Sequence, residues 1–383
     1  MLTCQRDAFS LPPDVHYLNC AYMSPLPKAV EAAGNAGMIS KRYPAEIHNT
    51  HFFEESDEAR RLFAQLVGAH DPDRVAIIPA ASYGVAVVTN NLTIGPGQNL
   101  VLLHEQFPGN VYAWRRWAAE CGAEIRTVAP PETGARGKVW NERILDAIDV
   151  GTAVVSMPHV HWTDGTLFDL VAIGRRAREV GAAFVVEATQ SVGALPFDIR
   201  EIQPDALIVA AYKWLLGPYA IGLAYFGPRF DHGTPLEETW IAREGSEDFQ
   251  HLVDYQDAYQ PGAIRYDVGE RANFILVPML VAALKLLVEW TPGGIQEYCR
   301  HITGGLLDEA RSLGFSTEDV AYRAEHLFGL RMPEGLDLVA LKGELERERI
   351  HASLRGSALR LSPHLYNDEA DTGALLEALR AVR

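Results

Sequence analysis

The residues best suited to chemistry are a glutamate and a lysine that follow two buried strands. One apolar run ends in Glu187, with Gln190 three residues later, and the next predicted strand ends near Tyr212 and Lys213. Active sites of open parallel sheets lie outside the carboxyl ends of the strands, so we expect these side chains at one edge. Burial beside apolar strand ends disfavours the ammonium form. We therefore expect a lowered pKa for Lys213, which suits attack on a carbonyl group.

The neighbouring carboxylate of Glu187 indicates which carbonyl compound Lys213 would attack. Pyridoxal phosphate (PLP) offers an aldehyde to a lysine and a pyridine nitrogen whose protonated form pairs with an acidic residue. Glu187 and Lys213 supply both groups. The alternative is a structural ion pair between them at the sheet edge. The two residues taken alone favour that alternative, because most charged pairs are structural.

Seven apolar runs predict the buried strands that position these residues. They are 75–79, 99–103, 125–128, 153–156, 183–186, 206–210 and 221–226. Segments with apolar residues three and four apart alternate with them and predict helices at 55–67, 83–92, 111–120 and 170–180. Strict alternation of strand and helix predicts an α/β fold with a mostly parallel, seven-stranded sheet.

The pattern changes near residue 255. Helices are predicted at 272–290, 295–313, 336–347 and 372–382, and strands at 327–331, 350–354 and 358–361. We therefore expect three parts. Residues 1–25 form an N-terminal segment that packs with the small domain, residues 26–255 form the large cofactor-binding domain, and residues 256–383 form a linking helix and a small α+β domain.

The composition of the chain limits the binding partners and the cellular compartment that we expect. The 383 residues carry 34 Lys and Arg against 50 Asp and Glu, a net charge of −16. This balance is not that of a nucleic-acid binder, and anionic lipid would repel it, so we expect neither partner. Four widely spaced cysteines and the lack of an apolar N-terminal stretch predict a cytoplasmic protein without disulfides. A nicotinamide enzyme is not expected, because no glycine-rich fingerprint joins a strand to a helix.

Residues 185–222 resemble the class V aminotransferase family of fold-type-I PLP enzymes, which includes cysteine desulfurases, kynureninases and isopenicillin N epimerase-like proteins. The family segment reads Asp-x-x-Gln, then His/Tyr-Lys, then Gly-Pro-x-Gly-x-Gly. Its counterparts here are Glu187, Gln190, Tyr212, Lys213, Gly217, Pro218, Ala220 and Gly222. The resemblance implies the fold-type-I transferase fold and PLP as cofactor. It makes Lys213 the catalytic residue that holds PLP, with Glu187, Gln190 and Tyr212 as further cofactor-binding residues.

The resemblance extends along nearly the whole chain and implies further cofactor contacts. Ala81 and Ser82 match a phosphate-binding turn at the start of a helix, and Phe107 matches the side chain that stacks on the pyridine ring. Trp162 stands where the family often has an asparagine that contacts the cofactor. Taken alone, Ser82 is an ordinary helix cap and Phe107 an ordinary core residue.

Two residues are implied to bind the substrate. Arg360 matches the arginine that holds the α-carboxylate, and Asn19 is expected nearby. No second arginine is evident for a side-chain carboxylate, so a neutral or bulky substrate is expected. The segment 351–357 lacks the cysteine of cysteine desulfurases, so persulfide chemistry is not expected.

The implied function is that of a PLP-dependent enzyme on an α-amino acid, acting through Cα deprotonation as a class V aminotransferase. The alternatives are a C–S lyase acting by β-elimination, an amino-acid epimerase, or a catalytically silent scaffold with the same fold. A homodimer is expected from the resemblance. The pair His159 and His161, with Asp164 nearby, is weighed as a metal site, but no further ligand cluster accompanies it and no metal is expected.

Overall fold

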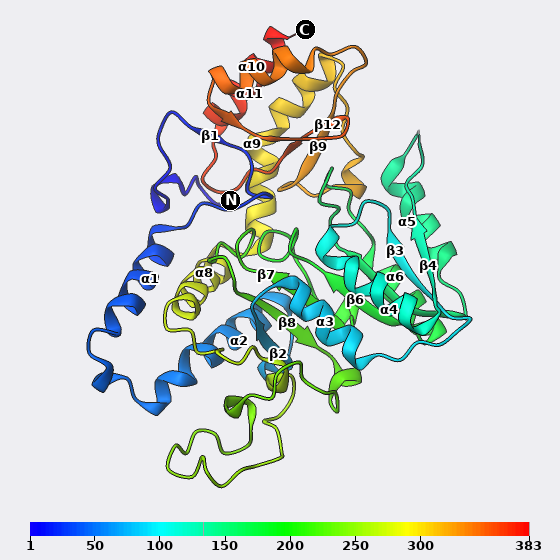
Figure 1. The fold of residues 1–383 in the computed structure, drawn as a ribbon. Coiled ribbons are helices and arrows are strands. Elements are labelled where there is room, and N and C mark those ends of the chain that lie inside the picture. The colour runs from blue at the N-terminus through cyan, green and yellow to red at the C-terminus, as the bar shows by residue number, and fades with distance from the viewer. Residues whose placement is uncertain (133, 383) are drawn as a thin grey trace.

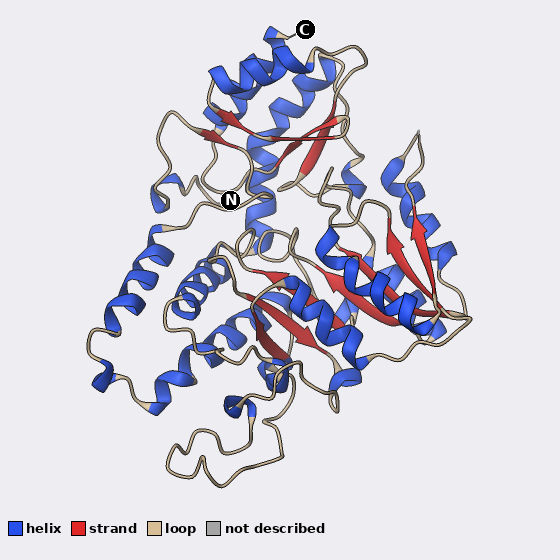
Figure 2. Cartoon of the chain, viewed as in Figure 1, coloured by secondary structure: helices blue, strands red, loops and turns tan. Residues whose placement is uncertain are grey.

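The structure is a computed structural model that describes residues 1–132 and 134–382. Figure 1 shows a larger part built on one sheet with helices on both faces, and a smaller C-terminal part with its own sheet. Figure 2 shows the helices and strands of both parts and the loops that join them.

Seven strands form the large sheet, in the order β2-β8-β7-β6-β5-β3-β4. Their bounds are β2 Val75–Ile78, β3 Asn99–Leu103, β4 Glu124–Val128, β5 Thr152–Pro158, β6 Ala183–Glu187, β7 Ala206–Ala210 and β8 Gly222–Phe226. All neighbours are parallel except β8, which is antiparallel to β2 and β7. The predicted α/β fold and its seven-stranded, mostly parallel sheet are confirmed.

Helices cover both faces of this sheet, which explains why most of its strands, the edge strand β4 excepted, are nearly continuous in apolar residues. The helices of this part are α1 Lys28–Ser40, α2 Glu54–Val67, α3 Ala81–Asn91, α4 Tyr112–Cys121, α5 Arg136–Ala147, α6 Leu170–Val180 and α7 Ile199–Ile202. Strand side chains alternate between two cores. Val209 packs with α2 and α6 on one face, and its neighbour Ile208 packs with α3 and α4 on the other. Helix α1 was not predicted, because its only buried residues are Val30 and Gly34 and its apolar periodicity is weak.

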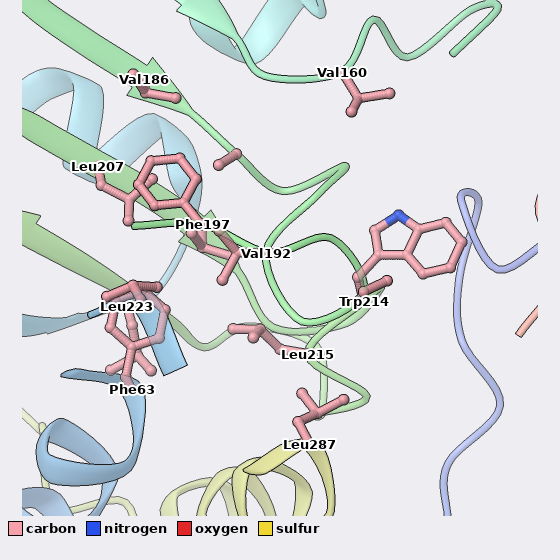
Figure 3. Packing of buried hydrophobic residues seen from close by; sticks show 14 of the residues in the cluster. Phe63, Val160, Val186, Val192, Phe197, Leu207, Trp214, Leu215, Leu223 and Leu287 are labelled. Carbon is pink, nitrogen blue, oxygen red and sulfur yellow. The ribbon is translucent and has the colours of Figure 1, made fainter. Parts of the chain in front are cut away.

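Close packing fixes the strands that end at the site. Figure 3 shows Val186 of β6, Leu207 of β7 and Leu223 of β8 in one core with Phe63 of α2 and Leu287 of α8, the helix Leu276–Trp290. All five side chains are fully buried. A close-packed protein core resists displacement, so these fully buried contacts hold the ends of β6 and β7 in fixed positions.

Two helices lead into the C-terminal part. Helix α8 spans Leu276–Trp290 and α9 spans Pro292–Ser312. They meet at an angle of 69°, and Thr291 between them has φ of 58°. Among the described residues, no single helix has the length and apolarity to cross a membrane, and only this bent pair together passes such a test by length and composition.

The small sheet has the antiparallel order β11-β12-β9, from β9 Phe328–Arg331, β11 Ser353–Arg355 and β12 Ala358–Leu361. Helices α10 Leu338–Arg347 and α11 Glu369–Ala381 complete this part. The single strand predicted at 350–354 is wrong in one respect. It divides into β10 Ile350–His351, which pairs with β1 His16–Tyr17 near the N-terminus, and β11, which pairs with β12. The division into parts at residues 25 and 255 stays a prediction.

Candidate active site

Side chains from five segments converge at one edge of the large sheet. Ser82 follows β2, Phe107 follows β3, Trp162 follows β5, Glu187 ends β6 and Lys213 follows β7. All five line one cavity with a volume of about 210 Å³. The remaining residues predicted to bind the cofactor line the same cavity, and they are Ala81, Gln190 and Tyr212. The structure therefore brings together all eight residues of the predicted cofactor set.

Lys213 is buried among rings and without a carboxylate partner. Its side chain is 6% exposed, and Nζ lies 5.3 Å from the centre of the Phe107 ring and 5.5 Å from that of Tyr212. Burial lowers the pKa of Lys213 to about 8, although Glu187 opposes this shift. Glu187 acts on Lys213 through its charge, without a hydrogen bond between the two side chains, so the structural ion pair weighed from the sequence is not formed in the described chain.

Glu187 is held in place from one side only. Its Oε1 accepts a hydrogen bond of 3.0 Å from the backbone amide of Thr189. The Thr189 hydroxyl accepts one from the amide of Ala210, which ties this turn to β7. Burial raises the pKa of Glu187. A desolvated carboxylate of this kind is stabilised by a cation in the cavity, which is the property needed opposite a protonated pyridine nitrogen.

Gln190 joins the sheet edge to distant parts of the chain. Its amide nitrogen donates to the carbonyl of Ala21, and its amide oxygen accepts from the indole of Trp214. His326 Nε2 donates to the Gln190 carbonyl over 2.8 Å, and burial lowers the pKa of His326 to about 4, which keeps that ring neutral. One amide hydrogen of Gln190 remains for a ligand in the cavity.

The turn after Gln190 requires a glycine. Gly193 has φ of 106°, and a Cβ at this position would lie 2.1 Å from the carbonyl oxygen of Trp214. At Gly193 the loops after β6 and β7 therefore come into direct backbone contact, which helps to keep Gln190 and Lys213 on one cavity.

The start of α3 is open toward the cavity. Its N-cap, Ala80, provides no side-chain hydrogen bond, and the amides of Tyr83 and Gly84 already donate to the Ala80 carbonyl. The amides of Ala81 and Ser82 precede the helical bonding pattern, so they and the helix dipole favour an anion such as a phosphate. With Glu187 and Lys213 on the same cavity, the residues present fit PLP.

A second cavity of about 420 Å³ opens beside the first. The two share several lining residues, and these are Phe107, Trp162, Tyr212, Lys213 and Tyr219. The second cavity adds Arg355 and Arg360 from the C-terminal part and residues 21–23 from the N-terminal segment. Lys213 thus lies where a cofactor cavity meets a space large enough for a small substrate.

Arg360 is anchored by neutral acceptors. Its Nη1 donates to the Trp162 carbonyl over 2.7 Å, and Nη2 lies 3.3 Å from both Asn19 Oδ1 and Ser353 Oγ. Its Nε is buried without an acceptor. Burial lowers the pKa of Arg360 to about 10, so it stays charged at neutral pH. Asn19 lies behind Arg360 and orients it, and the residues that line either cavity do not include Asn19.

The sequence analysis missed three residues that shape the site. Thr189 holds Glu187, Tyr219 borders both cavities and Arg355 lines the second. Thr189 could have been found from the sequence, because it lies between Glu187 and Gln190, which were both predicted to be in the site. Arg355 has none, because its direction depends on the register of β11 with β12.

The two histidines weighed as metal ligands serve other purposes. His161 contacts Thr163 and the His104 carbonyl through its two ring nitrogens. His159 packs edge-on against Phe197, and burial lowers its pKa to about 3. No group of three or more His, Cys, Asp or Glu side chains in the described parts of the chain is arranged to hold a metal ion.

Curated relatives cover most of the chain. It is 27% identical over 340 residues to the uncharacterized aminotransferase YcbU of Bacillus subtilis, with 86% of this chain and 84% of that protein covered. It is 25% identical over 336 residues to isopenicillin N epimerase of Streptomyces clavuligerus, with 85% and 84% covered.

Solved structures share the whole fold. The apo cysteine desulfurase of Thermococcus onnurineus superposes with a TM-score of 0.81 at 18% identity, covering 100% of this chain and 99% of that one. The cystine C–S lyase C-DES, in complex with its product cysteine persulfide, gives a TM-score of 0.80 at 19% identity, covering 96% and 97%. The family described as "Aminotransferase class-V" matches residues 33–239, more than half of the chain. The fold, the arrangement of Glu187 and Lys213, and this match lead to one conclusion: the chain belongs to the aminotransferase class-V family of PLP-dependent enzymes.

Proposed function

We propose that the protein acts on an α-amino acid by removing its Cα proton, with Lys213 as the catalytic residue and transamination as the reaction. One observation carries this proposal: Lys213 is the only lysine that lines either cavity, and it lies where the two meet. The neighbouring Arg360 is suited to the α-carboxylate, because a guanidinium binds a carboxylate through two hydrogen bonds.

Each residue has a distinct part in holding the cofactor. Ala81 and Ser82 would bind its phosphate with the first amides of α3, and Glu187 would keep its pyridine nitrogen protonated. Phe107, Trp162, Gln190 and Tyr212 would complete the lining of its cavity. When bound, PLP withdraws electrons from Cα and so stabilises the negative charge left by the departing proton.

The chain itself binds the substrate and moves the proton. Arg360 holds the α-carboxylate, and Asn19 and Ser353 fix the guanidinium that does so. The Lys213 amine, with a pKa lowered to about 8, accepts the proton from Cα. The same amine then delivers it, and the atom that receives the proton decides between the possible reactions.

A C–S lyase is the second candidate, and a specific observation favours it. The chain shares its fold with the cystine C–S lyase C-DES, and none of the residues lining the two cavities is a cysteine. Direct β-elimination needs no enzyme thiol, whereas persulfide transfer does. An epimerase is the third candidate, since epimerisation starts with the same proton removal. A silent scaffold is the alternative outside catalysis.

Product analysis with PLP-loaded protein and a panel of amino acids separates these reactions. We expect one equivalent of 2-oxo acid per site in the absence of an amino acceptor. Continued release of pyruvate and ammonia from cystine would show that the reaction is β-elimination and not transamination. Formation of the D-amino acid would indicate an epimerase. If no amino acid exchanges its Cα proton with D₂O, the protein is the catalytically silent scaffold and not an enzyme of this kind.

We also propose a homodimer with its active sites near the subunit interface. Large apolar side chains are exposed at the mouth of the second cavity, with Tyr22 59% and Tyr219 65% exposed. Others lie on the segment that protrudes between β8 and α8, where Val253 is 74% and Tyr255 89% exposed (Figure 1). A second copy covering these surfaces accounts for their exposure. Light scattering should give twice the chain mass, and a fully active, cofactor-bound monomer would contradict this.

A cytoplasmic location is proposed as well. All four cysteines are free, which fits a reducing compartment. The net charge of −16 supports the further proposal that neither nucleic acid nor anionic membrane is a partner.

A further inference from the structure

We propose that Arg355 binds the substrate's side chain and that the substrate is an α-amino acid with a second anionic group, such as a side-chain carboxylate. This inference rests on the proposed function, because it names the substrate class of the same site.

The register of the small sheet directs both arginines to one side. In the antiparallel pair of β11 and β12, Arg355 lies opposite Ala358, and Ser353 lies opposite Arg360. Directly opposed residues share a face of a sheet, as do residues two apart on one strand. Arg355 and Arg360 therefore leave the same face, and both line the second cavity beside Lys213.

The charge of this cavity is uncompensated. Its lining residues include the cations Lys213, Arg355 and Arg360 and no aspartate or glutamate. Arg355 donates to the carbonyl of its neighbour Leu354 over 2.9 Å, and its Nε is buried without an acceptor. The acceptors of Arg360 are the neutral groups already described.

A monocarboxylic amino acid leaves one of these charges unpaired. Its α-carboxylate is matched by Arg360, because one carboxylate saturates one guanidinium in a two-bond pair. The Arg355 guanidinium then remains beside the buried Lys213, whose ammonium it disfavours. A second anion on the substrate compensates Arg355, so that each of the two arginines in the cavity has an anionic partner. The expectation of a neutral or bulky substrate rested on finding no second arginine, and the structure supplies one.

Arg355 is also pre-positioned. Its guanidinium lies 5.6 Å from the ring of Trp162, whose carbonyl accepts from Arg360. Trp162 thus contacts both arginines from one turn and limits their freedom. Ordering before binding reduces the entropy lost on association, so the pair discriminates a ligand with two anions from one with a single anion.

Binding of ligands without an amino group tests the inference independently of turnover. Isothermal titration calorimetry of the PLP-loaded enzyme compares succinate with butyrate and glutarate with pentanoate, pairs matched in chain length. We expect at least one dicarboxylate to bind about tenfold to a hundredfold more tightly than its partner. Arg355→Gln should remove most of this preference and leave the affinity for the monocarboxylates unchanged, and Arg355→Lys should retain part of it.

Arg347→Gln serves as the matched control, because Arg347 is a surface arginine of the same part, with its side chain 63% exposed and paired with Glu344 and Glu348. It should leave all four affinities unchanged. Equal affinity for dicarboxylates and monocarboxylates in the wild type would overturn the inference. An equal loss of affinity for dicarboxylates and monocarboxylates in Arg355→Gln would also overturn the inference, because Arg355 would then help Arg360 to bind a single carboxylate.

Turnover distinguishes failure of this inference from failure of the proposed function. The ratio of kcat/KM for aspartate over asparagine, and for glutamate over glutamine, should fall in Arg355→Gln by the same factor as the binding preference. Turnover of neutral amino acids with no acidic preference would overturn only the substrate class. Absence of Cα proton exchange with every amino acid would overturn the proposed function, while the titrations would still decide whether Arg355 binds an anion.

Discussion

Lys213 is placed so that its amine loses charge close to neutral pH. Burial at 6% exposure disfavours the ammonium, and the nearby Arg355 and Arg360 act in the same direction. Glu187 acts in the opposite direction and keeps the shift from becoming larger. A lysine poised in this way is a nucleophile and a base without the help of a further residue.

This balance predicts a pH dependence for cofactor capture. Reaction of the cofactor-free protein with PLP needs the neutral amine, so its rate should rise through a pH of about 8, not through 10.5 as for an ordinary lysine. Because Glu187 raises the pKa of Lys213, Glu187→Gln should move the midpoint to lower pH. Stopped-flow absorbance measures the rate, and Glu179→Gln, at an exposed position of α6, should leave the midpoint unchanged. A midpoint near 10.5, or an upward shift in Glu187→Gln, would contradict the assignment.

Sequence reasoning worked at the residue scale where the residues lie close together along the chain. Glu187, Gln190 and Lys213 lie within one segment, and the strands on either side fix which edge they reach. The role of Arg355 was not predicted, because a hairpin must be in register before its side chain has a direction. Asn19 was predicted to lie near the substrate. Its role in orienting Arg360 was not predicted, because the hydrogen bond between them links residues 341 positions apart.

At the scale of elements, the loop between β7 and β8 carries backbone strain at the cavity. Ala220 lines the cofactor cavity with φ of 65°, a conformation that costs a residue with a Cβ about 1 kcal/mol. The related family segment has glycine at this position. The strain persists because the neighbouring strands, packed in the core of Figure 3, fix both ends of the loop.

Ala220→Gly should therefore stabilise the protein by about 0.5 kcal/mol, the relief of strain less the greater flexibility of glycine in the unfolded chain. Urea unfolding of the cofactor-free protein measures the change. Ala119→Gly, at an exposed helical position of α4, is the matched control and should destabilise by about 1 kcal/mol. Destabilisation of similar size in both variants would show that Ala220 is not strained.

The elements themselves were largely predictable, with informative exceptions. All seven strands of the large sheet were found. Six of them are short apolar runs that are almost entirely buried, and the edge strand β4, whose only buried residue is Val128, was found from its Ile and Val residues. The segment 350–354 reads as one strand, yet Ala352 separates the residues that pair with β1 from those that pair with β12. A change of pairing partner within one strand does not alter the hydrophobic pattern of the sequence, so it could not be predicted from that pattern.

At the scale of the whole molecule, the site is assembled from three distant stretches of the chain. The large sheet supplies the cofactor cavity, the C-terminal part supplies both arginines, and the N-terminal segment closes the space between them. Hydrogen bonds from Gln190 to Ala21 and from Arg360 to Asn19 hold the N-terminal segment to both parts. The fold class follows from local patterns, whereas this convergence follows from long-range contacts that no local pattern encodes.

The central claim is that Lys213 holds PLP, and chemical mapping tests it most directly. The protein is loaded with PLP, reduced with borohydride so that the linkage becomes permanent, digested, and analysed by peptide mass spectrometry. The account predicts the phosphopyridoxyl mass on the peptide that contains Lys213, and its disappearance in Lys213→Ala. A label on another lysine, or no label on wild-type protein saturated with PLP, would contradict the account.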